Sequence, residues 1–254
     1  MGTSSSSAGA GGKSPLIPAG TDATPGAPIP PAEPNRFQPF RVAFGHHARG
    51  IGRGSFLKSA LGRYARTATG GARVGPRRFG PAYSSGGSLF ALLGDMQGGG
   101  TGSASVGVDL SGLVGRSLTL AVQEIARALA PEGIDADRVA VAINEAMTEV
   151  LADEEIFDPS ALSADQIVEV LVDYLARILF QQVTEDAGSA WNRSPSEART
   201  IEAENELFDL IKIAMDRQLG PKLASGVGRM SKADVERAQL NAIREVWREW
   251  ETFE

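Results

Sequence analysis

Glycine and proline are unevenly distributed along this chain, and their distribution restricts where regular structure can form. Residues 1–109 hold 23 of the 30 glycines and 10 of the 14 prolines, a level typical of low-complexity or disordered segments. Residues 110–254 hold only the remaining 11, so long helices can run there without interruption. We therefore expect a folded C-terminal part that is preceded by a largely disordered N-terminal region.

The charges are distributed in the same uneven way. Residues 1–109 carry 11 basic and 4 acidic side chains, whereas residues 110–254 carry 14 basic and 27 acidic ones. The formal net charge of −6 hides this difference. The sequence thus indicates a basic N-terminal region attached to an acidic body.

The second part of the chain has a helical pattern from Ser111 onward. Apolar residues recur at helical spacing, and several segments begin with capping residues, so we predict an all-α fold with a five-helix bundle over 111–254. We expect Trp247 and Trp250, one turn apart, to lie in the core rather than on a partner-binding face. The predicted helices cover 112–130, a segment after Asp135, a segment from the capping box Ser163-Ala-Asp-Gln166, a segment from Ser194 to Gly220-Pro221, and 231–253.

The first part is divided by composition into three segments. Residues 1–35 contain scarcely any large apolar side chains, and the only cluster of them is the island Pro15-Leu-Ile-Pro18, so we predict a disordered tail in which this island could serve as a docking point. Residues 36–96 are predicted to form a basic arm, and residues 97–110 a linker. The arm is expected to contain one or two short helices, at 55–67 with Ser55 as N-cap and at 88–96.

The residue types needed for most catalytic and metal sites are scarce. The chain contains no cysteine and only two histidines, His46 and His47. Gly12-Lys13-Ser14 lacks the earlier glycine and the preceding strand of a phosphate-binding loop. We therefore expect no enzymatic activity, no cofactor and no metal site. The chain has no apolar stretch of membrane-spanning length and no secretory signal, so we expect a cytoplasmic location.

Five arginines of the basic arm form the first candidate site. Arginine contacts phosphate groups through two parallel hydrogen bonds, and the aromatic residues nearby could stack on bases. These features suggest binding of nucleic acid, but docking onto an acidic protein surface explains them equally well. The five residues are Arg63, Arg66, Arg73, Arg77 and Arg78.

Gly2 is the second candidate site, as a site of modification. A small residue after Met1 permits methionine removal, which would leave a free glycine amine. An α-amino group has a pKa of about 7.7–8, against about 10.4 for lysine, so a substantial fraction is nucleophilic near neutral pH. Met-Gly-x-x-x-Ser also fits the loose myristoylation pattern, and an ordinary disordered start remains the alternative.

Several runs of this sequence resemble the QatB family, component B of bacterial Qat anti-phage defence systems. The runs are Met1-Gly-Thr-Ser-Ser-Ser-Ser, Pro15-Leu-Ile-Pro18, the stretch from Ala60 to Gly80, and Arg244-Glu-Val-Trp-Arg-Glu-Trp-Glu251. The resemblance implies three companions: a KAP-type P-loop ATPase, a QueC-like enzyme and a TatD-like nuclease. QueC enzymes activate a deazaguanine carboxylate with ATP for attack by ammonia, and a protein amine could replace the ammonia.

These observations lead to two main functional hypotheses. The first is a non-enzymatic subunit of a defence complex, which acts as a scaffold and as a substrate for conjugation at Gly2 by the QueC-like partner. The second is a nucleic-acid-binding adaptor, whose basic arm presents phage DNA to the nuclease. An enzyme with an unrecognised site among the carboxylates of the bundle is a third hypothesis.

Overall fold

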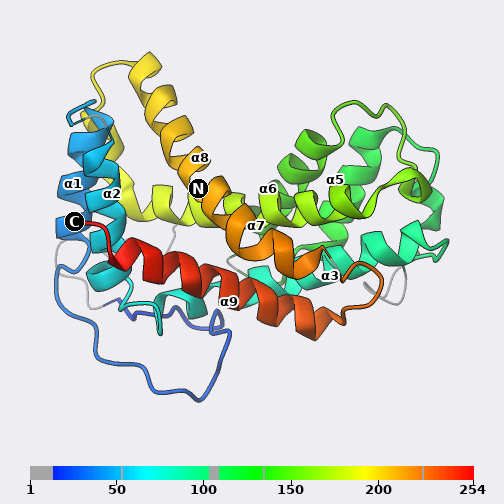
Figure 1. The fold of residues 1–254 in the computed structure, drawn as a ribbon, viewed down its shortest axis with the longest axis horizontal. Coiled ribbons are helices and arrows are strands. Elements are labelled where there is room, and N and C mark those ends of the chain that lie inside the picture. Colours follow the sequence, from blue (N-terminus) through cyan, green and yellow to red (C-terminus); the bar gives the residue numbers. More distant parts are fainter. Residues whose placement is uncertain (1–13, 53, 103–108, 134, 225) are drawn as a thin grey trace. The chain divides into compact units, whose positions relative to one another are not determined.

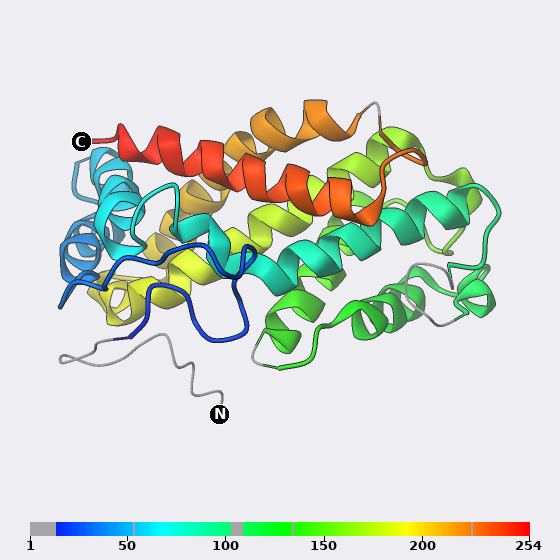
Figure 2. The same ribbon diagram turned by 90° about the horizontal axis from the view of Figure 1, so that it is seen from below.

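The regular structure of this chain is helical. The computed structural model describes residues 14–52, 54–102, 109–133, 135–224 and 226–254. Over these ranges eight α-helices are joined by 3₁₀ and π turns, and β-pairing is limited to a single bridge between Ser117 and Ile156 (Figures 1 and 2). The all-α prediction is confirmed. No helix among the described residues combines the length and apolar composition that a membrane crossing requires.

Each of the five helices predicted after residue 111 has a counterpart in the structure. They are α5 (Leu118–Leu129), α6 (Ala136–Val150), α7 (Ala164–Ala187), α8 (Glu197–Leu223) and α9 (Lys232–Glu251).

The predicted capping box at the start of α7 is confirmed. The Ser163 hydroxyl accepts from the Gln166 N–H at 3.1 Å, and the Gln166 side chain accepts from the Ser163 N–H at 2.9 Å. Ser231 and Asp234 form the same reciprocal pair at the start of α9. Two orphan donors of each first turn are thereby satisfied.

Two predicted helix limits were wrong. The first helix of this part starts at Leu118 rather than near 112, because a 3₁₀ turn and the bridge at Ser117 occupy the preceding residues. Helix α8 does not stop at Gly220-Pro221 but continues to Leu223. The turn goes on because the Ala224 N–H donates to the Gly220 carbonyl at 3.0 Å.

The basic arm contains more helix than the sequence predicted. Helix α1 (Gln38–Ala48) was not predicted, although its buried side chains follow helical spacing. Helix α2 (Ser55–Arg63) was predicted, but Gly54 at φ +86° occupies the N-cap position that we assigned to Ser55. Helix α3 (Gly80–Gln97) is twice as long as the predicted 88–96 segment.

The prediction of a disordered tail over 1–35 was wrong for the described residues 14–35. Leu16 and Ile17 are buried against Val74, and the buried Arg36 donates to the Ser14 carbonyl at 2.8 Å. These partners are distant in sequence, so composition alone could not reveal them. Residues 1–13, and residues 103–108 of the predicted linker, lie outside the described residues.

Contacts within the chain define two compact units. Unit 1 contains the described residues up to Gly80, together with Leu179–Ala214 and Ala242–Glu254. Unit 2 contains Pro81–Ile178 and Met215–Asn241. Each unit thus combines N-terminal and C-terminal segments, so these units do not coincide with the predicted division at residues 35, 96 and 110.

The core of unit 1 is aromatic. Tyr64 packs against Phe40 at a centroid distance of 4.9 Å and against Trp247 at 5.9 Å. Trp247 and Trp250 stack on each other at 5.3 Å, and both are fully buried. The prediction that these tryptophans belong to the core is therefore confirmed.

The core of unit 2 is mainly aliphatic and includes three buried hydrogen bonds from side chains to main-chain carbonyls. Tyr174 donates to Ala82, and Ser85 donates to Leu129, both at 2.8 Å. Gln239 donates to the carbonyl of Tyr83 at 3.0 Å. These bonds fix α3 against α5, α7 and α9 within the unit. Its buried aliphatic residues include Leu89, Leu92, Val122, Ile125, Val139, Ile143, Leu171 and Leu175.

Candidate functional site

The five arginines predicted as one binding site have two different environments, both within unit 1. Arg63, Arg66 and Arg73 are exposed, whereas Arg77 and Arg78 are buried. The structure therefore does not present all five to one external ligand.

Arg77 is held by the segment that precedes α1. Its guanidinium group donates to both carboxylate oxygens of Asp22, at 3.0 and 2.6 Å. It also donates to the carbonyls of Thr24, Ala27 and Pro28 at 3.0–3.2 Å. The hydrogen bond from Arg77 and its charge hold the pKa of Asp22 below the ordinary value. Arg77 thus forms with Asp22 of its own chain the bidentate hydrogen bonds that arginine also forms with carboxylate and phosphate ligands.

Arg78 belongs to a buried polar cluster within unit 1. It forms an ion pair with Asp186 of α7 at 3.0 Å, and only 6% of Arg78 and 1% of Asp186 is exposed. The same carboxylate accepts from the Tyr64 hydroxyl at 2.8 Å and from Gln182 at 3.1 Å. Burial alone would lower the pKa of Arg78, but the Asp186 carboxylate raises it above its ordinary value, so the Arg78 guanidinium group is charged.

Arg66 binds the last residues of the described chain. Its guanidinium group donates to the carbonyls of Glu251 and Phe253, and the Glu251 side chain accepts from the Ala72 N–H at 2.7 Å. Arg63 donates to the Pro39 carbonyl at 3.3 Å. Both side chains remain exposed, so these contacts leave part of each guanidinium group accessible.

The adjacent histidines lie in different surroundings. His46 packs its ring against Phe56, whereas His47 is 1% exposed and lies 3.4 Å from the Glu206 carboxylate. No group of three or more histidine, cysteine, aspartate or glutamate side chains suited to a metal occurs in the part of the chain that the structure describes.

Burial makes His47 a source of pH-dependent stability. Burial lowers its pKa below the ordinary value of about 6.5, while the Ala203 carbonyl and Glu206 act in the opposite direction. The unfolded chain therefore binds a proton more readily, so stability falls as the pH drops below about 6.5. We expect the difference in Tm between pH 7.5 and pH 5.5 to shrink in His47→Gln.

His46→Gln is the matched control for this prediction, since it removes the neighbouring imidazole. Thermal unfolding of both variants and of the unmodified chain at the two pH values checks the prediction. An equal pH difference in His47→Gln and in the unmodified chain would contradict it.

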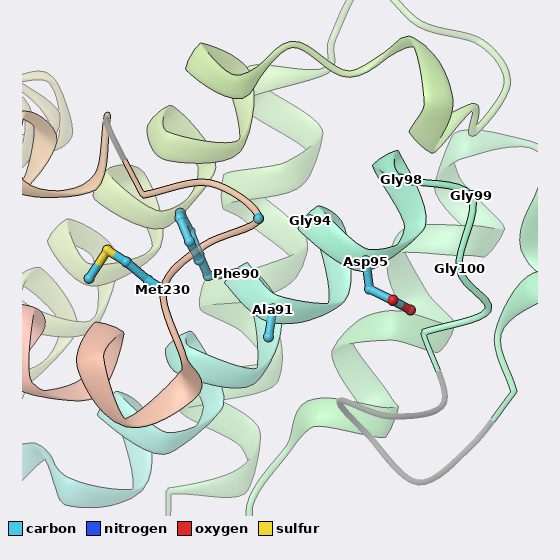
Figure 3. Close-up of a pocket in the computed structure, with 9 residues that line it drawn as sticks. Phe90, Ala91, Gly94, Asp95, Gly98, Gly99, Gly100 and Met230 are labelled. Carbon is cyan, nitrogen blue, oxygen red and sulfur yellow. The ribbon is translucent and has the colours of Figure 1, made fainter.

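An open pocket of about 570 Å³ lies in unit 2 at the C-terminal end of α3 (Figure 3). Glycines form much of its wall, and a Cβ at Gly94 would lie 3.6 Å from the main-chain nitrogen of Gly228. The Asp95 carboxylate points toward the loop after α3 and accepts from the Gly102 N–H at 2.8 Å. Asp95 therefore holds Gly102 close to the end of α3. The lining residues are Phe90, Ala91, Gly94, Asp95, Gly98–Gly100, Gly228 and Met230.

The residues that organise unit 1 were missed from the sequence. Arg36 donates to four acceptors, in Ser14, Pro15 and Ala68, and Asp22 and Asp186 neutralise two arginines. One signal for the Asp22–Arg77 pair was available in the sequence. Asp22 and Glu33 are the only acidic residues before the basic arm, so they are the natural nearby partners for its arginines. Gly2, the predicted modification site, lies outside the described residues.

Comparison with known proteins identifies one family. The family model described as "Qat anti-phage system associated protein QatB" matches residues 70–250, more than half of the chain. No curated protein and no solved structure matches the chain. The matched range includes the buried pair Arg78–Asp186 and both core tryptophans. The chain therefore belongs to the QatB family of proteins associated with the Qat anti-phage system.

Proposed function

We propose that this protein is a non-enzymatic subunit of the Qat defence system that acts as a scaffold and as a conjugation substrate. Its Gly2 amine receives a deazaguanine-type group from a QueC-like partner, while its helical body docks the KAP-type ATPase or the TatD-like nuclease. Membership of the QatB family supports the role in anti-phage defence.

The anchoring of the chain at Ser14 supports this proposal most directly. Arg36 donates to the carbonyls of Ser14 and Pro15 at 2.8 and 3.1 Å, and Leu16 and Ile17 are buried. Gly2 precedes this anchor by twelve residues. Twelve residues can span at most about 40 Å. A group attached to Gly2 would thus remain tethered within that distance of unit 1.

The proposed reaction is an amide condensation. The partner activates the deazaguanine carboxylate with ATP, and the neutral Gly2 nitrogen attacks the activated carbonyl carbon. The new C–N bond forms while the bond to the activating group breaks, and the amine loses a proton. An α-amino group suits this step because its pKa of about 7.7–8 leaves much of it unprotonated near neutral pH.

Mass spectrometry of the N-terminal peptide tests this proposal. After co-expression with the active QueC-like partner, we expect a Met-less peptide with an added mass on Gly2. Lys13→Arg should keep the added mass, because Lys13 is the only lysine in the first 35 residues and the only competing side-chain amine there. Gly2→Glu should lose it, since a large second residue prevents removal of Met1.

An inactivated partner serves as the second control and should yield the unmodified peptide. An unmodified Met-less chain after co-expression with the active partner would contradict the conjugation proposal. Added mass that disappears in Lys13→Arg would place the modification on the lysine instead.

The second candidate function is that of a nucleic-acid-binding adaptor. The exposure of Arg63, Arg66 and Arg73 supports it, because their guanidinium groups are accessible to phosphate. The burial of Arg77 and Arg78 limits it, since both already bind carboxylates of this chain. Contact of Arg77 with phosphate therefore requires displacement of the segment that covers it, whereas the three exposed arginines need no such change.

A further inference from the structure

Residues 14–35, which we call the strap, cover two buried arginines of unit 1 without forming a helix. Figure 2 shows the strap as an irregular path in dark blue. Arg77 donates five hydrogen bonds to it, and Arg36 donates three. Two main-chain bonds add to these: the Ala23 N–H donates to the Arg77 carbonyl, and the Gly80 N–H donates to the Thr21 carbonyl, both at 2.9 Å.

The strap has few apolar contacts of its own. Leu16 and Ile17 are its only buried large side chains, and they pack against Val74. Most of the residues from Ala19 to Asn35 are exposed or half-buried. A segment with few buried apolar groups and no regular internal hydrogen bonds needs less free energy to detach from the fold than a core helix does. Its attachment therefore depends strongly on the arginine contacts.

The surface beneath the strap is cationic. Arg36 and Arg77 lie under it, and the exposed Arg73 precedes Val74, which forms part of the apolar contact. Residues 36–83 contain ten basic and no acidic side chains. Of the acids that contact this region, Asp22 pairs with Arg77, Asp186 pairs with Arg78, and Glu251 accepts from the Ala72 N–H. Opening the strap would thus leave at least three guanidinium groups accessible.

The present occupant shows what these arginines bind. Asp22 meets Arg77 through two parallel hydrogen bonds, the arrangement that arginine also forms with phosphate. The other acceptor oxygens of the strap are main-chain carbonyls and the Ser14 hydroxyl. The oxygens of the strap therefore occupy donor sites that phosphate oxygens could occupy instead.

We propose that the strap is a displaceable cover and that phosphate groups of nucleic acid replace it at Arg36 and Arg77. The inference rests on the second candidate function and is independent of conjugation at Gly2. Nucleic acid is favoured over an acidic peptide because several arginines without intervening carboxylates match a backbone of regularly spaced charges.

Three single variants separate strap opening from a change in charge. Asp22→Asn leaves the buried Arg77 charge uncompensated, which favours opening. Leu16→Ser removes an apolar anchor without changing the net charge. Glu33→Gln is the matched control: it changes the charge by the same amount as Asp22→Asn, but Glu33 is exposed.

Hydrogen exchange of the full chain reports whether the strap opens. We expect the Ala23 and Gly80 amides, which bond across the strap, to exchange at least about tenfold faster in Asp22→Asn and Leu16→Ser. Exchange in Glu33→Gln should equal that of the unmodified chain. Equal exchange in the chain without substitutions and in all three variants would overturn the proposal.

Fluorescence anisotropy with a labelled oligothymidylate reports whether the uncovered surface binds nucleic acid. We expect Asp22→Asn and Leu16→Ser to bind at least about tenfold more tightly than the unmodified chain and Glu33→Gln. Adding Arg77→Ala to Asp22→Asn should abolish this gain and reduce the slope of log K against log salt by about one.

The outcomes distinguish the strap from the adaptor function. If all four proteins bind DNA with equal affinity, the strap proposal fails and the adaptor function stands. If none binds DNA, both fail. If the open variants bind an acidic peptide but no DNA, the surface serves a protein partner and the nucleic-acid proposal is overturned.

Discussion

Replacing Asp186 with asparagine should lower the free energy of unfolding by about 3 to 5 kcal/mol, because it leaves the buried Arg78 guanidinium without its anionic partner. The same carboxylate oxygen also accepts hydrogen bonds from Tyr64 and Gln182. The amide oxygen of an asparagine carries no negative charge, so its hydrogen bonds to these three donors would be weaker. Chemical denaturation with urea, followed by tryptophan fluorescence, measures the loss.

Glu124→Gln is the control for this prediction. Its ion pair with Arg127 is exposed, with 73% of the arginine side chain accessible, so its loss should cost less than about 1 kcal/mol. The double variant Arg78→Met/Asp186→Leu should be more stable than Asp186→Asn, because no unpaired charge remains. A loss in Asp186→Asn no larger than that in Glu124→Gln would show that the buried pair does not hold unit 1 together.

The helices after residue 111 could be predicted because their signals are local. A capping box such as Ser163–Gln166 and an apolar repeat every three to four residues lie within one or two turns of each other. The end of α8 could not be predicted in the same way. Pro221 normally terminates a helix, but here it lies in the last turn and the helix continues to Leu223.

The N-terminal region was mispredicted because its stabilising contacts are not local. Asp22 and Arg77 are 55 residues apart, and Arg78 and Asp186 are 108 residues apart. Composition showed an excess of cations over residues 36–83 and therefore predicted an exposed arm. The structure instead buries Arg77 and Arg78, each beside one carboxylate. Arg77 and Arg78 differ from the exposed Arg73 in their pairing with carboxylates that are distant in sequence, and a single sequence does not reveal such pairs.

The candidate sites were predictable to different extents. The chemistry of a glycine amine follows from residue type alone, so Gly2 could be proposed without a structure. The island Pro15-Leu-Ile-Pro18 was also visible as a possible docking point, and Leu16 and Ile17 are indeed buried. The residue against which it packs was not visible, because Val74 lies between the two helices predicted for the basic arm, at 55–67 and 88–96.

Replacing Gly75 with alanine should destabilise the protein by about 2 to 4 kcal/mol, from overpacking together with a lost buried hydrogen bond. A Cβ at this position would overlap the indole nitrogen of Trp247 and lie 2.7 Å from the Thr69 hydroxyl. These two groups are hydrogen-bonded to each other at 2.8 Å, so the methyl group would come between donor and acceptor. Trp247 is fully buried among Tyr64, Phe79 and Trp250 and has no room to shift.

Gly112→Ala is the matched control for Gly75→Ala, because no atom lies within 4 Å of its added Cβ and its stability should change by less than about 0.5 kcal/mol. Trp247→Phe removes the donor that the methyl group displaces. If the clash with the indole causes the loss, Gly75→Ala should cost less in the Trp247→Phe background than in the unmodified chain. Equal losses in both backgrounds would assign the effect to the backbone at Gly75 rather than to the packing of the aromatic core.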